Sequence, residues 1–253
     1  TLFYSSYAVD GYKSHIGVSN IMSYEKDDGS ITSGIGYYTN TYDSKAIEGL
    51  IDIDPHSDRE STGTDILVSG FEWEGNWQDE IIRSVLLNFF ITVYQRKLIV
   101  RINDIEINHK NVGELINELE DNEENRILKN YFNLLDAENK IVVKYPGKTY
   151  NDRKNQETIT FEDGEAELLL TEGENLNRKV LMTRKNGMKI YEQDRISGSI
   201  SFSGILIIKG NNMNSIFKQL ENPAHNGWSA NRYEKNPNLA NKIYKDLRDF
   251  IRY

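Results

Sequence analysis

The sequence contains no cysteine, which excludes disulfide bonds and thiolate metal ligands. It has no run of about 18 apolar residues and no signal peptide, so we expect a cytoplasmic protein without a membrane-spanning helix. Its four histidines are scattered without metal-ligand spacing, so no metal site is predicted. Neither a G-x-S-x-G elbow nor a G-x-x-x-x-G-K-[ST] loop occurs, which argues against a serine hydrolase and against a P-loop enzyme.

Basic residues are outnumbered by acidic ones, because 30 Lys and Arg stand against 39 Asp and Glu. The 253 residues therefore carry a formal net charge of −9. Such an acidic chain is a poor non-specific binder of nucleic acid, since neutralising phosphates requires clustered Lys and Arg. The exception is the segment 178–195, in which six basic residues face only Glu192 and Asp194. Nucleic acid is therefore an alternative partner that the net charge does not favour.

The first 72 residues have the character of strands and loops. Segments 1–9 and 13–24 flank Asp10-Gly11, a turn signal that predicts a β-hairpin. The remaining predictions are a Gly-rich aromatic strand at 31–39, a polar surface loop at 40–62, and a strand at 65–71 opened by Gly63-Thr64.

Residues 73–253 mix helices and strands. The clearest helix is 76–97, where apolar residues recur every three or four positions, and Asn76 with Asp79 predicts a capping box. Segments 165–173 and 178–192 are interpreted as an antiparallel pair. The other predictions are strands at 97–104, 104–108, 140–143 and 158–161, a central strand at 200–210, and helices at 112–120, 124–135, 214–220 and 237–252.

This order predicts an α+β fold with a domain boundary between residues 72 and 73. For the second domain we expect a mixed or antiparallel sheet with helices on one face.

Two segments are candidates for function. Arg184 and Lys185 flank the tight-turn signal Asn186-Gly187, and a hairpin turn there would direct cations outward, where they could reach a phosphate. A solvated hairpin with ordinary surface charge is the alternative. The second segment, 222–228, places His225 and Trp228 in one irregular loop, either for interaction with a partner or because Trp228 anchors the loop to the core.

The order of these motifs resembles the bacterial ATP-binding proteins of the GHKL class, which includes gyrase B, histidine kinases and MutL. The segments that carry the resemblance are "TLFYSSYAVDGYKSHIGVS", "GIGYY", "GTDILVSGF", "NWQDEIIRSVLLNFFITVYQRKLIV", "LMTRKNGMKIYE", "FSGILII" and "NPAHNGW". They cover most of the chain, and their order is more specific than any one of them.

The resemblance implies that residues 1–72 are the last strands of a GHKL nucleotide-binding sandwich and that 73–253 form a transducer-like domain. In that class a Gly-Thr pair opens a late strand near the adenine pocket, here Gly63 and Thr64. The transducer contributes a lysine to the γ-phosphate of ATP, a role that would fall to Lys185 or to Arg184.

The departures from the class matter as well. A helix with a Glu general base and a Mg²⁺-binding Asn, a D-x-G-x-G turn and a Gly-rich lid are not found in these residues. The chain begins at Thr1 within an expected strand, so we interpret it as a fragment whose partner is a missing N-terminal ATP-binding region. ATP and Mg²⁺ are expected in the intact protein, whereas the fragment alone is expected to need no cofactor and to be inactive.

The sequence therefore supports two hypotheses about function. In the first, the parent is an ATPase that couples ATP binding and hydrolysis to conformational change or to homodimerisation. In the second, the chain is a nucleotide-independent docking or dimerisation module. By analogy at the level of the class alone, DNA repair or defence against phage is the expected setting.

Overall fold

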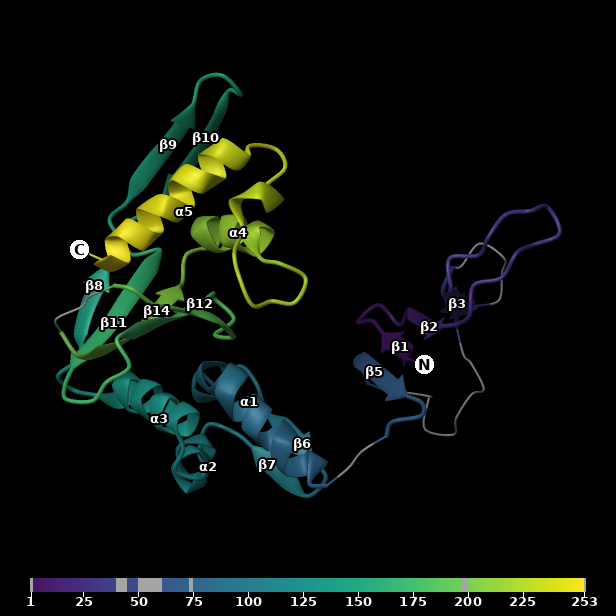
Figure 1. Cartoon of the computed structure of the whole chain (residues 1–253), viewed down its shortest axis with the longest axis horizontal. Coiled ribbons are helices and arrows are strands. Elements are labelled where there is room, and N and C mark those ends of the chain that lie inside the picture. Colours follow the sequence, from purple (N-terminus) through teal and green to yellow (C-terminus); the bar gives the residue numbers. More distant parts are fainter. Residues whose placement is uncertain (1, 40–44, 50–60, 73–74, 197–199, 253) are drawn as a thin grey trace. The chain divides into compact units, whose positions relative to one another are not determined.

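The computed structural model describes residues 2–39, 45–49, 61–72, 75–196 and 200–252 (Figure 1). The chain divides into two compact units, unit 1 (Thr1–Gly75) and unit 2 (Asn76–Tyr253). This division falls three residues after the boundary expected from the sequence. The described elements combine helices with several mainly antiparallel sheets, which confirms the α+β class.

Unit 1 is built around a single antiparallel sheet. Its strands are β1 (Leu2–Tyr7), β2 (Lys13–Asn20), β3 (Ile35–Tyr38), β4 (Ile47–Glu48) and β5 (Gly63–Val68). The order is β3-β2-β1-β5, and β4 pairs with β2. The predicted hairpin is confirmed, because β1 and β2 pair from Leu2↔Val18 to Tyr7↔Lys13 around Gly11, whose φ is +85°. Glycine adopts such a left-handed φ without steric cost.

The described part of unit 1 contains no helix, so among these residues nothing forms a second layer on its sheet. Ile47 is its only buried hydrophobic residue among those described, beside the buried polar side chains of Ser5 and His15. His15 Nε2 lies 2.7 Å from the carbonyl oxygen of Gly49. The predicted loop 40–62 lies partly outside the described residues, and β4 shows that it is not loop throughout.

Unit 2 contains most of the regular structure. Its elements are α1 (Trp77–Tyr94), β6 (Val100–Ile102), β7 (Ile105–Ile107), α2 (Val112–Glu118), α3 (Glu123–Asp136), β8 (Ile141–Lys144), β9 (Lys148–Asp152), β10 (Glu157–Phe161), β11 (Ala166–Glu172), β12 (Lys179–Thr183), β13 (Lys189–Gln193), β14 (Phe202–Ile208), α4 (Asn211–Leu220), the 3-10 helix η1 (Ala230–Arg232) and α5 (Pro237–Arg252).

The main sheet of unit 2 has five strands in the order β13-β12-β14-β11-β8. The prediction of a central strand is confirmed, because β14 lies in the middle and all seven of its residues are buried. The predicted pairing of β11 with the β12–β13 hairpin is wrong, since β14 lies between them. It pairs antiparallel with β11 and parallel with β12. A strand that is apolar on both faces takes the most buried position in a sheet, and this outweighs closeness along the chain.

Helices cover both faces of this sheet, not one face as expected (Figure 1). The physical reason is the alternation along β14. Ile205 and Ile207 belong to the core that contains α1, α2 and α3, whereas Leu206 and Ile208 belong to the core that contains α4 and α5. Each face therefore needs its own helical layer to remove its apolar side chains from water.

The ends of α5 and α1 test the helix boundaries and caps that the sequence predicts. Helix α5 spans the predicted residues 237–252, with Asn236 Oδ1 accepting a hydrogen bond from Leu239 N at 3.1 Å. The capping box predicted for α1 is wrong in detail. Asn76 occupies the N-cap position, but its side chain donates to the Asp79 carboxylate and makes no bond to a backbone N–H.

Candidate functional site

The β12–β13 turn is the centre of the candidate site. Gly187 N donates to the carbonyl oxygen of Arg184 at 2.8 Å, which closes the turn, and Gly187 has a φ of +86°. A Cβ built on Gly187 would lie 3.0 Å from both the backbone nitrogen and Oγ1 of Thr92 on α1. The turn therefore requires glycine for its backbone conformation and for its close approach to the helix.

Helix α1 and its C-terminal end hold this turn by hydrogen bonds to its carbonyl groups. Thr92 Oγ1 donates to the Asn186 oxygen at 2.9 Å, and Lys97 Nζ donates to the Lys185 oxygen at 2.8 Å. These two bonds join residues about ninety positions apart in the chain. The turn is consequently a fixed part of unit 2, and the residues beside it have defined positions.

Lys97 bonds to this turn, and the charges of two further lysines in other connecting segments act on it. We call Lys97, Lys185 and Lys209 the lysine cluster. Lys185 is exposed, and its Nζ donates to Asn211 Oδ1 at the start of α4 at 2.5 Å. Lys209 lies between β14 and α4, where its Nζ pairs with the Glu167 carboxylate. Partial burial first, and then the charges of Lys185 and Lys209, lower the pKa of Lys97. The positive charges of neighbouring lysines disfavour the charged form of Lys97, and a nearby anion would offset this effect.

Arg184 has a different environment from Lys185, although the two are neighbours in sequence. Its guanidinium is buried and forms an ion pair with Glu221, and its Nη1 lies 3.3 Å from Asn214 Oδ1. The expectation that the turn directs Arg184 outward is wrong, because the side chain extends beneath the turn toward the end of α4. A cation already neutralised in this way is not available to a phosphate.

Glu221 is a site residue that the sequence analysis missed, and it links both candidate segments. Its side chain is 2% exposed and accepts bonds from Arg184 and from His225 Nδ1. Burial alone would raise its pKa, but the hydrogen bonds from Arg184 and His225 lower that pKa overall. The only signal in the sequence was an acidic residue directly before the irregular 222–228 loop.

The two candidate residues of that loop differ in exposure. The His225 side chain is 60% exposed, whereas Trp228 is 7% exposed and pairs with Glu221 in a β-bridge. The Trp228 ring lies edge-on to Phe217 and Tyr191, with centroid distances of 4.7 and 5.5 Å. Trp228 therefore anchors the loop to the core, and only His225 of the two presents its side chain to solvent.

Gly63 and Thr64 lie in unit 1 at the start of β5, as expected for a strand opened by this pair. Thr64 is exposed, and its Oγ1 lies 3.0 Å from Ser6 Oγ on the neighbouring strand β1. Within the described ranges, no three His, Cys, Asp or Glu residues lie close enough together to hold a metal ion.

Three of the six basic residues in segment 178–195 form ion pairs with acidic side chains. Lys179 and Lys189 both pair with Glu192, at 3.2 and 3.1 Å, and Arg184 pairs with Glu221. These pairs reduce the net positive charge of the hairpin, and nucleic-acid binding stays an alternative that the net charge of the chain does not favour.

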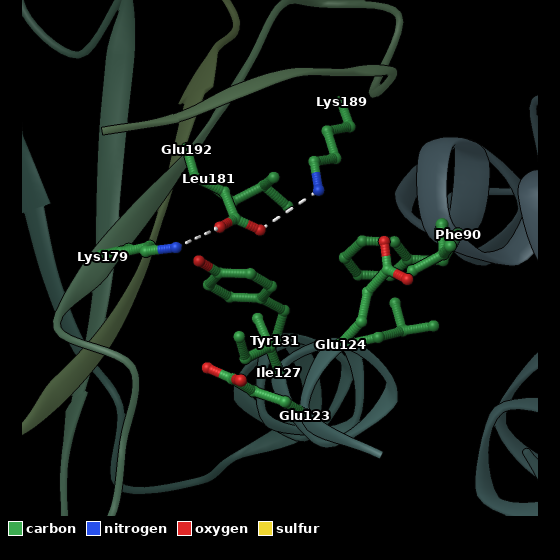
Figure 2. Close-up of a pocket in the computed structure, with 11 residues that line it drawn as sticks. Phe90, Glu123, Glu124, Ile127, Tyr131, Lys179, Leu181, Lys189 and Glu192 are labelled. Atoms are coloured by element: carbon green, nitrogen blue, oxygen red, sulfur yellow. Dashed lines mark hydrogen bonds and ion pairs between the residues drawn. The ribbon is translucent and has the colours of Figure 1, made fainter. Parts of the chain in front are cut away.

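A pocket of about 350 Å³ lies beside this hairpin, between it and helices α1 and α3. Figure 2 shows Lys179 and Lys189 reaching Glu192 from two sides, next to the ring of Tyr131. Asn177 Nδ2 donates to the Tyr131 hydroxyl at 2.6 Å, while burial and the charge of Glu192 raise the Tyr131 pKa. These polar groups satisfy one another, so the pocket has a structural explanation without a ligand.

Comparison with models of protein families finds no match to this sequence, and comparison with curated proteins finds none either. Within the described residues, no helix combines the length and the apolar character needed to cross a bilayer.

Proposed function

We propose that this chain is the transducer region of a GHKL-class ATPase together with the edge of its nucleotide-binding domain. The observation that carries the proposal is the lysine cluster at a rigid hairpin turn. The charges of Lys185 and Lys209 both act on Lys97, and of the three lysines only Lys209 has an ion-pair partner among the described residues. A phosphate group would relieve their mutual repulsion and would accept hydrogen bonds from the amines.

Lys185 is the residue that we assign to the γ-phosphate. It is exposed at the tip of the turn, and its only bond through Nζ is to the neutral amide of Asn211 among the described residues. Arg184, the other candidate, is committed to Glu221. In this role Lys185 would stabilise the charge that develops on the phosphate during phosphoryl transfer, and Lys97 would fix the backbone of the turn.

The sheet of unit 1 is a second observation that supports the proposal. Its described residues form one sheet without a covering layer, and a β-sheet is stable when at least one face is buried. A sheet that forms the edge of an α/β sandwich would likewise lack its covering layer when taken without the rest of the sandwich. In this proposal the residues that hold ATP and Mg²⁺ belong to the N-terminal region of the intact protein.

Replacing Lys185 with alanine in the intact ATPase is expected to lower kcat by about 10²-fold, because one preorganised charge on the transferring phosphate is lost. The measurement is ATP turnover at saturating ATP. Lys154→Ala, an exposed lysine on the β9–β10 turn, is the matched control and should leave turnover unchanged. Unchanged turnover in Lys185→Ala would remove this residue from the mechanism.

The alternative function is a nucleotide-independent docking or dimerisation module. Its dimerisation form is favoured by the apolar side chains on one face of the unit 1 sheet. Ile66 and Val68 lie two positions apart on β5, so they share one face of the sheet, and each is more than half exposed. If this face mediates self-association, the chain alone should be a dimer at micromolar concentration, and Ile66→Lys should make it monomeric. Light scattering coupled to size exclusion distinguishes the two functions, since a monomer without nucleotide contradicts the alternative.

A further inference from the structure

A second hollow in unit 2 lies away from the lysine cluster, with a volume of about 730 Å³. Residues of α1, β7, α2, the connection from α2 to α3 and the first turn of α3 line it. Its volume falls within the range of about 300 to 1,000 Å³ that is usual for ligand sites. Part of the lining is apolar and is contributed by Ile82, Leu86, Ile105, Leu115 and Leu119.

The polar lining of this hollow is strongly acidic. Asp79, Glu80, Glu118 and Glu120 contribute four carboxylates, and we call the hollow the acidic groove. The one cation in the lining, Arg83, forms an ion pair with Glu124, which lies outside the groove lining. Among the described residues, Glu80, Glu118 and Glu120 have no ion-pair partner. The groove therefore has an excess of negative charge beside an apolar surface.

A buried acceptor without a partner lies in the same lining. Asn125 is 2% exposed, and its Oδ1 has no hydrogen-bond partner among the described residues. The orientation of its amide is fixed, because Nδ2 donates to the Glu120 carbonyl oxygen at 3.0 Å. Turning the amide over would place two oxygens against each other. A buried acceptor of this kind is normally paired, so it indicates a missing donor.

We propose that the acidic groove binds an arginine side chain of a partner peptide. A guanidinium group carries five N–H donors in one plane and can serve carboxylates and an amide oxygen together. Its aliphatic stem suits the apolar lining. A metal ion fits less well, because no three of the described carboxylates come close enough together to hold one. The charge of the groove selects a basic peptide over an acidic one.

The test uses the whole chain and a labelled ten-residue peptide of alanine and leucine with two arginines four positions apart. Its counterpart carries citrulline, which has the shape of arginine without the charge. Fluorescence anisotropy gives the affinity, and the side-chain amide signal of Asn125 in an NMR spectrum reports the place of binding. Glu118→Gln/Glu120→Gln removes two groove charges, and Glu138→Gln/Glu174→Gln removes two exposed charges elsewhere.

We expect saturable binding of the arginine peptide with a shift of the Asn125 amide, and no saturable binding of the citrulline peptide. The groove variant should raise Kd about five- to tenfold, whereas the control variant should change it less than twofold. Equal Kd values for both variants, or an unmoved Asn125 signal, would overturn the proposal. Displacement of the peptide by spermidine at equal affinity would also overturn it, since charge alone would then explain binding.

Discussion

Replacing Glu221 with alanine is expected to lower the free energy of unfolding of unit 2 by about 3 to 5 kcal/mol. The substitution removes the carboxylate that neutralises Arg184, and it leaves a buried guanidinium without a counter-charge. Its other partner there, Asn214 Oδ1, is neutral and lies 3.3 Å away. Urea unfolding of the full chain, followed by far-UV circular dichroism, measures the change.

Two variants separate the charge effect from the loss of packing. His225→Ala removes only the exposed partner of Glu221 and should cost much less than Glu221→Ala. In Arg184→Met/Glu221→Leu both charges are replaced by apolar groups, and stability should return close to that of the parent chain. A double variant as unstable as Glu221→Ala would show that the buried pair does not act as an ion pair.

The same pair gives the stability of unit 2 a defined dependence on pH. Hydrogen bonds from Arg184 and His225, opposed by burial, leave the pKa of Glu221 below its usual range. A carboxyl whose pKa is lower in the folded state contributes stability above its unfolded pKa, near 4.3, and loses it as the pH falls through the folded value. The advantage of the parent chain over Glu221→Gln should therefore shrink below about pH 4.

Replacing Trp228 with alanine is expected to cost about 3 to 5 kcal/mol, because a large buried aromatic ring leaves a cavity in the core. The ring contacts Phe217, Tyr191 and Tyr244, so its loss affects α4, β13 and α5 together. The measurement is again the free energy of unfolding. A loss below about 1 kcal/mol would contradict the anchoring role and would return Trp228 to the candidates for a partner surface.

Phenylalanine at this position is the informative control. Trp228 Nε1 is buried and has no hydrogen-bond partner among the described residues, so Trp228→Phe breaks no hydrogen bond. It keeps an aromatic ring against Phe217 and should lose less than half as much stability as Trp228→Ala. A phenylalanine variant as unstable as the alanine variant would indicate that the indole N–H is needed.

Local chemistry in the sequence determined the elements of this protein. The periodic apolar residues of 76–97 and 237–252 gave helices α1 and α5, because one broad apolar stripe is sufficient to define an amphipathic helix. The β1–β2 hairpin followed from Asp10-Gly11 for the same local reason. The polar strand β9 was missed, since "KTYND" has too few apolar side chains to signal a strand.

The tertiary structure alone decided which side chains act together. Nothing local indicates that β14 separates β11 from β12, or that helices cover both faces of the sheet. In the sequence, Arg184 and Lys185 are two adjacent basic residues with the same predicted role. In the structure, Arg184 is buried against Glu221, 37 residues later in the chain, whereas Lys185 is exposed. Pairing between distant charges depends on how the chain packs, because burial and distance set the energy of a charge more than its neighbours in sequence do.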